Sequence, residues 1–347
     1  MNFNARPRHS HAFVQNVYKA LVSLLLMLAS AFSHAQCSVN GGGEQNLGQF
    51  STLTFFSEPH NTSFSSGFSC QSFLNLGYTN RGKYRVEVND GLLKRQGGSA
   101  TDAIPYSILD ENDDPLPSNQ DHVLDMGRIN IFGGPGDTMQ LKLRIEQSNL
   151  QLPAGKYVGT IQMRWYYWAC FAGAFPFGCL SSSSSPGFKV SGNSVNNWGT
   201  GTLVTLTVSV TLNKDCMINA PSVNFGSAPL VAAFNPVTQT LNITCSAGAD
   251  YTVGMDNGKN VDAGTRRMRM GSGNSYLRYE LFKSASGNDR WGNLGSERRH
   301  SSTAEVAPGI YDGSTTQGFV YRAVIEPTQA TPPPGTYTDN IVVDVDF

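Results

Sequence analysis

Charged side chains are scarce in this sequence, since Lys, Arg, Asp and Glu make up only 15% of its 347 residues. The 25 basic and 26 acidic residues nearly cancel, and this balance argues against nucleic-acid binding, which requires a basic surface. The low charge also argues against a disordered, solvating chain. The length suffices for two domains, each with its own hydrophobic core.

Helical patterns are also lacking, because no stretch combines a helical hydrophobic period with helix caps. The sequence has instead 36 Gly, 17 Pro and several stretches in which apolar and polar residues alternate. Residues 141–145, 204–212 and 341–347 show this two-residue period, which is typical of strands with one buried face. Many short strands separated by turn residues predict an all-β protein built from two consecutive β-sandwiches.

The apolar stretch near the N-terminus is too short to span a membrane, and no second stretch is longer. Residues 1–35 combine three basic residues, the uncharged segment 20–32 and small residues at Ser33 and Ala35. This order predicts a secretory signal peptide, whereas the alternative interpretation is a buried helix. We therefore expect an exported mature chain that begins at residue 36.

Metal-ligand spacing is missing from the cysteines, since no Cys-x-x-Cys pair occurs and only three His residues follow residue 35. We therefore expect neither a metal site nor a cofactor. An even number of cysteines behind a signal peptide indicates disulfides instead. The count leaves several pairings open, and proximity in the sequence favours three of them. These are Cys37–Cys70, Cys170–Cys179 and Cys216–Cys245.

One ordered set of features occurs twice in the chain: two cysteines, a Tyr-x-Val segment that ends in Gly, and a Pro-x-Gly-x-Tyr turn. The two copies are Cys37, Cys70, 84–91 and 153–157 in the first half, and Cys216, Cys245, 251–258 and 333–337 in the second. Such a repeated order indicates duplicated domains. We expect an N-terminal domain over residues 36–213 and a C-terminal domain over residues 214–347.

The second copy carries a longer series of landmarks, which run in order through its full length. They are Cys216, Asn224-Phe225-Gly226, Cys245, Tyr251, Asp256-Asn257-Gly258, Arg266-Arg267-Met268, 277–282, Trp291-Gly292, Tyr321-Arg322-Ala323 and 334–339. On these landmarks, residues 216–347 resemble the spore coat U domain family, the pilin-like modules of archaic chaperone–usher pili. The first copy lacks the Arg-x-Met and Trp-Gly landmarks. A divergent domain before a pilin-like one is similar to the two-domain tip adhesins of these pili.

The resemblance implies two tandem immunoglobulin-like (pilin-like) sandwiches, of which the C-terminal one is incomplete and is completed by a donor strand. The implied partners are a periplasmic pilus chaperone, an outer-membrane usher and a neighbouring pilin subunit that adds its strand to an open groove. The predicted groove residues are Ile341, Val343, Val345 and Phe347, which alternate along the last strand. An ordinary terminal edge strand is the alternative interpretation.

The donor segments indicate where the subunit lies in the fibre. Shaft pilins of the family carry an extension before their first cysteine, whereas only Gln36 precedes Cys37 in the expected mature chain. The strand at 204–212 precedes Cys216, but we expect it to close the first sandwich. A subunit that accepts a strand and offers none belongs at one end of the fibre. The sequence thus predicts a subunit at the tip.

The best candidate for a binding surface is an uncharged aromatic segment, residues 165–180. A disulfide between Cys170 and Cys179 would close a small apolar loop at one end of the sandwich. The predicted surface-binding residues are Trp168, Phe171, Phe175, Pro176, Phe177 and Leu180. Positions in the core are the alternative for these aromatic residues. Residues 131–135 form a second candidate loop tip.

Signals for catalysis and ion binding are weak. The sequence contains no Gly-x-Ser-x-Gly, His-Glu-x-x-His or phosphate-loop motif, so we expect no enzyme. Residues 110–114 alternate acidic side chains as calcium loops do, but Pro115 stands where such a loop needs Gly, which favours a solvated acidic turn. Arg266, Arg267 and Arg269 are expected on a solvated edge strand.

These observations predict a non-enzymatic tip adhesin of an archaic chaperone–usher pilus, exported through the periplasm to the cell surface. It would attach to abiotic or host surfaces and support biofilm formation through apolar loops of its N-terminal domain. Three alternatives stay open. They are a structural pilus or coat subunit without a ligand, a lectin-like module that binds glycans, and a secreted hydrolase.

Overall fold

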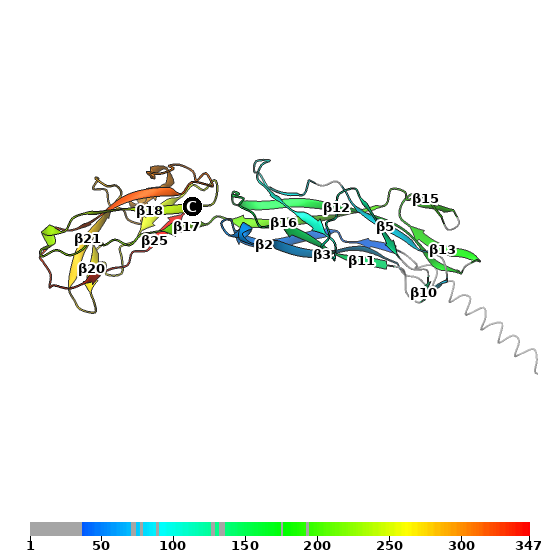
Figure 1. The fold of residues 1–347 in the computed structure, drawn as a ribbon, viewed down its shortest axis with the longest axis horizontal. Coiled ribbons are helices and arrows are strands. Elements are labelled where there is room, and N and C mark those ends of the chain that lie inside the picture. The colour runs from blue at the N-terminus through cyan, green and yellow to red at the C-terminus, as the bar shows by residue number, and fades with distance from the viewer. Residues whose placement is uncertain are drawn as a thin grey trace, which may run out of the picture.

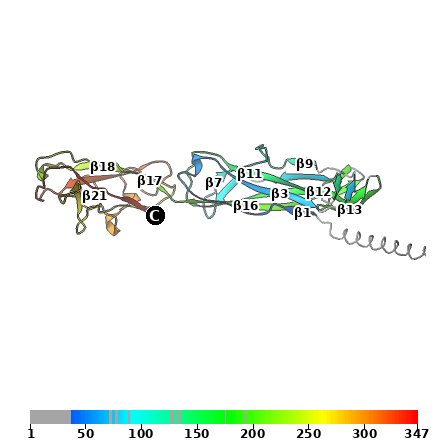
Figure 2. The same ribbon diagram turned by 90° about the horizontal axis from the view of Figure 1, so that it is seen from below.

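The computed structural model describes residues 37–70, 74–76, 79–87, 90–125, 129–131, 136–174, 176–191 and 194–347. The signal peptide predicted at residues 1–35 lies outside this part of the chain. In the described ranges the regular elements are β-strands and short 3-10 helices, and a helix able to span a membrane is not found among them. The strands form two β-sandwiches that lie end to end (Figure 1, Figure 2).

One sheet of the first sandwich has four antiparallel strands in the order β1-β3-β11-β8. Their bounds are Cys37–Asn40 (β1), His60–Cys70 (β3), Gly136–Ile145 (β11) and Ser107–Leu109 (β8). Side chains on β11 alternate between the core and the solvent, and Leu141, Leu143 and Ile145 are buried. The strand predicted at 141–145 is therefore confirmed as part of β11.

The other sheet of this sandwich is organised around the longest strand, β12, Gly155–Ala174. One edge of β12 pairs antiparallel with β16, Thr202–Asn213, and β16 in turn pairs in parallel with β2, Gly43–Ser51. The strand predicted at 204–212 is thus confirmed as β16, within the first sandwich. Smaller strands complete the sheet: β4 (Leu74–Leu76), β5 (Arg81–Val86), β6 (Leu92–Arg95), β7 (Ala103–Pro105), β9 (Asp121–Asp125), β10 (Ile129–Ile131) and β13 (Gly178–Ser184).

A separate hairpin and a 3-10 helix accompany this sandwich. The hairpin consists of β14, Lys189–Ser191, and β15, Ser194–Asn197, and the helix is η1, Phe55–Ser57. The core is aromatic at its centre, where Trp165 is fully buried and donates its indole N–H to Ser66 Oγ at 2.9 Å. Because that N–H is paired, the ring is buried without a cost for an unsatisfied donor.

The second sandwich pairs a six-stranded sheet with a three-stranded one. The larger sheet comprises, in spatial order, β17 (Cys216–Asn219), β18 (Val237–Cys245), β23 (Gln317–Ile325), β21 (Tyr276–Phe282), β20 (Arg266–Met270) and β24 (Tyr337–Thr338). The smaller sheet comprises β22 (Arg299–His300), β19 (Thr252–Met255) and β25 (Val343–Asp346), and the 3-10 helices are η2 (Val231–Ala233), η3 (Gly295–Glu297) and η4 (Ser301–Thr303). The strand predicted over 341–347 corresponds to β25, which is shorter because it covers only Val343–Asp346.

The Pro-x-Gly-x-Tyr turns give the two sandwiches the same corner. Tyr157 donates its hydroxyl to the Pro153 carbonyl at 2.6 Å, and Tyr337 donates its hydroxyl to the Pro333 carbonyl at 2.7 Å. A Tyr that bonds back to the chain a few residues upstream is typical of immunoglobulin-like sandwiches. When Tyr157 is aligned with Tyr337, the pairing of β12 with β5 corresponds to the pairing of β25 with β19.

The three disulfides join the cysteines that lie close in the sequence. Cys37–Cys70 connects β1 to β3, and Cys216–Cys245 connects β17 to β18 at the same register of the second sandwich. Cys170–Cys179 connects the two strands of the β12–β13 hairpin. Each bridge thus lies within a single sandwich, as a duplicated domain plan requires.

Mass spectrometry of unreduced peptides tests this connectivity directly. We expect peptides linked through Cys37–Cys70, Cys170–Cys179 and Cys216–Cys245, because each pair lies on neighbouring strands. Closing each loop could stabilise its sandwich by about 2–4 kcal/mol. Reduced and alkylated digests serve as the control. A peptide that links a cysteine of the first sandwich to one of the second would contradict the fold.

Candidate functional site

The two sandwiches differ at one strand position. In the first, β16 lies between β2 and β12 and is paired along both of its edges. In the second, residues 220–226 follow β17 as β2 follows β1, and residues 337–343 follow the tyrosine corner as β12 does. Among the described residues, no strand pairs with these two segments in the position that β16 holds in the first sandwich.

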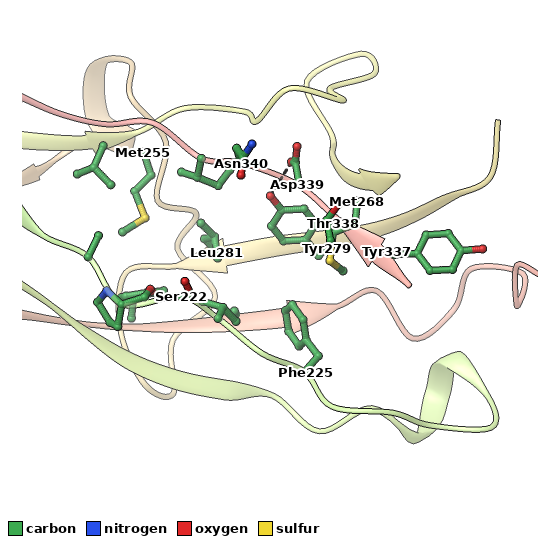
Figure 3. A pocket seen from close by; sticks show the side chains of 17 residues that line it. Ser222, Phe225, Met255, Met268, Tyr279, Leu281, Tyr337, Thr338, Asp339 and Asn340 are labelled. Carbon is green, nitrogen blue, oxygen red and sulfur yellow. Dashed lines mark hydrogen bonds between the residues drawn. The ribbon is translucent and has the colours of Figure 1, made fainter. Parts of the chain in front are cut away.

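A cavity of about 330 Å³ lies at this position, with an apolar floor. Figure 3 shows Phe225 and Ser222 on one side of it and Asp339 and Asn340 on the other, with Leu281 between them. Further apolar lining comes from Val223, Met255, Met268, Tyr321, Ala323 and Ile341. The cavity is therefore a groove between two chain segments that stand where a strand is missing.

Burial alternates along the second wall of the cavity. Thr338 and Asn340 also line it but are exposed, whereas four residues of the wall are half-buried: Tyr337, Asp339, Ile341 and Val343. The residues aligned with them in the first sandwich are Tyr157, Gly159, Ile161 and Met163, which stand opposite Val210, Val208, Leu206 and Val204 of β16. The groove thus occupies the space that apolar side chains of β16 fill in the first sandwich.

The predicted groove residues separate into two groups. Ile341 and Val343 line the cavity. Val345 stands outside the cavity lining, pairs with Val253 and packs against the core of the sandwich. Phe347 is 48% exposed, and its ring centre lies 5.4 Å from Lys214 Nζ, so its assignment to the groove is wrong. The reason is that the cavity lining ends at Val343, and the chain continues beyond it to Phe347 beside Lys214.

A loop at residues 256–260 fixes the wall formed by 339–342. The Asp256 amide donates to the Val342 carbonyl at 3.0 Å, and Asp256 Oδ1 accepts the Val342 amide at 2.9 Å. Asp339 accepts the Lys259 amide at 3.0 Å and the Tyr279 hydroxyl at 2.8 Å. Gly258 has a φ of +75°, and a Cβ there would collide with the Asp339 carboxylate, so any other residue would be strained and would displace that carboxylate.

Two titratable groups beside the groove are held in one protonation state. Burial, reinforced by the Asp339 carboxylate, raises the pKa of the Tyr279 hydroxyl, which therefore stays neutral and donates to Asp339. Burial lowers the pKa of the Arg266 guanidinium, while its ion pair with Glu280 opposes that change. The Tyr279 hydroxyl therefore remains a hydrogen-bond donor across the ordinary pH range.

Arg266 is fully buried, which corrects the expectation of a solvated arginine. Its guanidinium donates to the carbonyl oxygens of Asp256 at 2.8 Å, Met255 at 2.7 Å and Trp291 at 2.6 Å, and it pairs with Glu280. A buried charge is tolerated only when it is paired and hydrogen-bonded in this way. The Arg266 side chain thereby anchors the beginning of the loop that holds the groove wall.

The apolar hairpin formed by β12 and β13 is the second candidate site. Its turn is closed by the Phe177 amide, which donates to the Ala174 carbonyl at 2.7 Å. Phe177 is 87% exposed and Leu180 is 83% exposed, and Pro176 is exposed beside them. Phe175 lies outside the described residues, as do residues 132–135 of the second predicted loop tip.

Bulges in this hairpin decide which side chains face outward. Pairing passes from Cys170–Ser182 to Ala172–Ser181 and then to Gly173–Cys179, so Phe171 and Leu180 are extra residues. Such a residue turns its side chain away from regular alternation. Leu180 therefore projects into solvent, whereas Phe171 is only 1% exposed and belongs to the core. The prediction that Phe171 binds a surface is wrong.

The remaining predicted residues of the hairpin have intermediate roles. Trp168 is half-buried on β12, opposite Ser184. Gly173 leaves room for the disulfide, because a Cβ there would lie 2.9 Å from Cys170 Sγ.

The acidic residues at 110–114 form a turn in which Asp110 Oδ1 accepts the amides of Asn112 and Asp114, at 2.8 and 2.9 Å. That carboxylate is thus occupied by the chain itself.

Sequence reasoning also missed an apolar patch on the flank of the first sandwich. Val123 on β9 is 74% exposed beside Val195 and Trp198. Lys83 Nζ lies 4.6 Å from the centre of the Trp198 ring and is paired with Asp121 at 2.6 Å. The sequence of β5 places basic residues at alternate positions, but only its register with β9 brings Lys83 beside Asp121 and Val123.

The comparisons with known proteins fit this geometry. Residues 202–344 match the family model of the Spore Coat Protein U domain. A comparison with curated proteins finds no match. The chaperone–tip adhesion subunit pre-assembly complex CsuC-CsuE, from archaic chaperone-usher Csu pili of Acinetobacter baumannii, contains a chain that is 28% identical, with a TM-score of 0.57. That match covers 90% of this chain and 100% of the other.

Two further structures are less similar. The CupB6 tip adhesin from Pseudomonas aeruginosa is 13% identical over 90% of this chain and 93% of its own, with a TM-score of 0.34. The CooA pilin subunit from enterotoxigenic Escherichia coli is 12% identical over 51% of this chain and 98% of its own, with a TM-score of 0.30. Residues 202–344 thus resemble the Spore Coat Protein U domain, and the chain is similar, over most of its length, to a chain of an archaic chaperone-usher tip complex.

Proposed function

We propose that this protein is the tip adhesin of an archaic chaperone–usher pilus, with an adhesin domain over residues 36–213 and a pilin domain over 214–347. The observation that carries the proposal is that one strand position is filled in the first sandwich and open in the second. In the first sandwich, β16 fills the slot between β2 and β12. In the second, the corresponding slot is the apolar groove beside Ile341.

The same strand supports a position at the end of the fibre. β16 precedes Cys216, where a pilin of this family carries the segment that it donates, and the family match begins at residue 202, which is the start of β16. Both edges of β16 are hydrogen-bonded, so it cannot leave without breaking the first sheet. The chain therefore accepts a strand but does not donate this one. Its similarity to a chain of a chaperone–tip adhesion subunit complex also supports this position.

A strand added to the groove would complete the second sandwich, because it would pair with the backbone and cover the apolar floor. A periplasmic chaperone would supply it first, and a neighbouring pilin subunit would replace it at the outer-membrane usher. By analogy with β16, it would run antiparallel to residues 337–343 and direct every second side chain toward the floor. Backbone hydrogen bonds would hold the strand, and its apolar side chains would fill the cavity.

Fusing a flexible linker and a donor strand after Phe347 should give a soluble monomer that needs no chaperone. The strand would cover the apolar groove and pair with the open backbone edges. Size-exclusion chromatography and thermal unfolding measure the outcome. The matched control carries the same strand with its inward-facing residues replaced by Ser. Equal stability of this control, or a stable monomer of the unfused chain, would contradict the proposal.

The exposed hairpin tip is the proposed attachment surface. Residues 165–188 contain no charged side chain, and Phe177 and Leu180 are almost fully exposed. Removing one such side chain from water contributes about 1.5–3 kcal/mol. The Cys170–Cys179 disulfide orders the hairpin in advance, which lowers the entropic cost of binding. A tip of this kind suits apolar abiotic or host surfaces, and attachment of this kind begins a biofilm.

The double variant F177S/L180S should lose attachment to polystyrene by at least about tenfold, since two apolar contacts are removed. Both side chains are exposed, so the fold should be unaffected, as circular dichroism and thermal unfolding will verify. Binding of purified, groove-complemented protein to polystyrene beads gives the measurement. L294S is the matched control, because Leu294 is 73% exposed on the second sandwich.

Unchanged attachment of the folded double variant would disprove a role for the hairpin. Attachment that free sugars abolish would favour the lectin-like alternative instead. Gold labelling of fibres separates a tip subunit from a structural shaft subunit. The proposal expects one copy at the far end of each fibre, whereas labels distributed along the shaft would overturn the tip position.

A further inference from the structure

A buried cluster of hydroxyl groups lies where the two sandwiches meet. Thr52 follows β2 of the first sandwich, and Ser246 follows β18 of the second. Their hydroxyl oxygens are 2.5 Å apart, and the two residues are only 4% and 1% exposed. Beside them, Ser51 donates its hydroxyl to Asp215 Oδ2 at 2.6 Å. Side chains of both sandwiches thus bond directly across the junction.

The connecting segment at 213–215 is bonded to both sides as well. The Thr52 amide donates to the Asn213 carbonyl at 3.2 Å, which ties the segment to the first sandwich. The Asp215 amide donates to Ser246 Oγ at 2.8 Å, and the Ser246 amide donates to the Asp215 carbonyl at 2.9 Å. Because these donors and acceptors are satisfied within the cluster, bending the joint would leave buried polar groups unpaired.

Beside the hydroxyl cluster, two loops of the second sandwich lie close to a loop of the first. A Cβ added at Gly248 would lie 4.0 Å from Pro153 Cβ, and one added at Gly313 would lie 3.5 Å from Gln151 Cβ. Pro153 is itself fixed, because its carbonyl accepts the Tyr157 hydroxyl. The loops of the two sandwiches therefore lie close together beside the hydroxyl cluster, and the two sandwiches continue one another in both views (Figure 1, Figure 2).

We propose that Ser51, Thr52, Asp215 and Ser246 lock the two sandwiches into one rigid unit. The joint would then hold the hairpin tip at a fixed orientation to the groove and transmit load without a hinge. A linker without such bonds behaves differently, because domains joined only by a short segment are expected to move relative to one another. The proposal concerns the joint alone and does not depend on what the hairpin or the groove binds.

Distance measurements between spin-labelled unnatural amino acids at Gln162 and Thr238 test the lock, since both are exposed strand residues, one in each sandwich. The parent chain, with its groove filled by the fused donor strand, should give one narrow distance distribution, and every variant is measured in the same fused form. The variant T52V/S246A removes the paired hydroxyls with little change in volume, and should at least double the width of that distribution. S51A, at a partly exposed position, should broaden it less and guards against a double variant that fails to fold.

T244V is the matched control. Thr244 lies on β18, just before Ser246, and the substitution removes its exposed hydroxyl contact with Thr316. It should keep the width of the parent distribution. A broad distribution in the parent would overturn the proposal. So would a parent-like width in both T52V/S246A and S51A, provided that each sandwich unfolds as it does in the parent.

Discussion

The need to hydrogen-bond one strand position determines how this molecule is organised. It is the position that β16 occupies between β2 and β12 in the first sandwich. A sheet edge beside an apolar core needs a partner for its backbone groups and a cover for its side chains. In the first sandwich β16 provides both, because its backbone pairs with β12 and its own side chains Leu206, Val208 and Val210 are buried in the core. In the second sandwich the equivalent position is open, and the proposed chaperone, donor strand and place in the fibre all follow from that difference.

The groove is open, but its wall is held in place. Asp256 bonds Val342 through both its amide and its carboxylate, while Asp339 turns toward the loop at 256–260 and the Tyr279 hydroxyl. Arg266 supports that loop from the interior. The landmarks that mark the second sandwich in the sequence therefore have a physical role. They keep the groove formed in the absence of the proposed donor strand, so less ordering would be required for that strand to bind.

The longest strand of the first sandwich links its core to the exposed hairpin tip. β12 carries core residues as far as Phe171, and the disulfide joins it to β13, where Phe177 and Leu180 are exposed. Two bulges there place Phe171 inside and Leu180 outside. Together with the bonded joint at Thr52 and Ser246, this arrangement connects an apolar tip to a groove at the other end through continuous packed structure.

Local patterns in the sequence were enough to predict the strands at 141–145 and 204–212 and the tandem copies, because alternation and short cysteine separations depend on neighbouring residues. Three outcomes depended on contacts between distant segments. Phe171 is buried because the register with β13 slips, and Arg266 is buried because Glu280 and three carbonyl groups surround it. Phe347 stands outside the groove because the cavity lining ends at Val343. Bulges, charge burial and the extent of a groove are set by neighbouring segments, and the pattern within one strand carries no information about those segments.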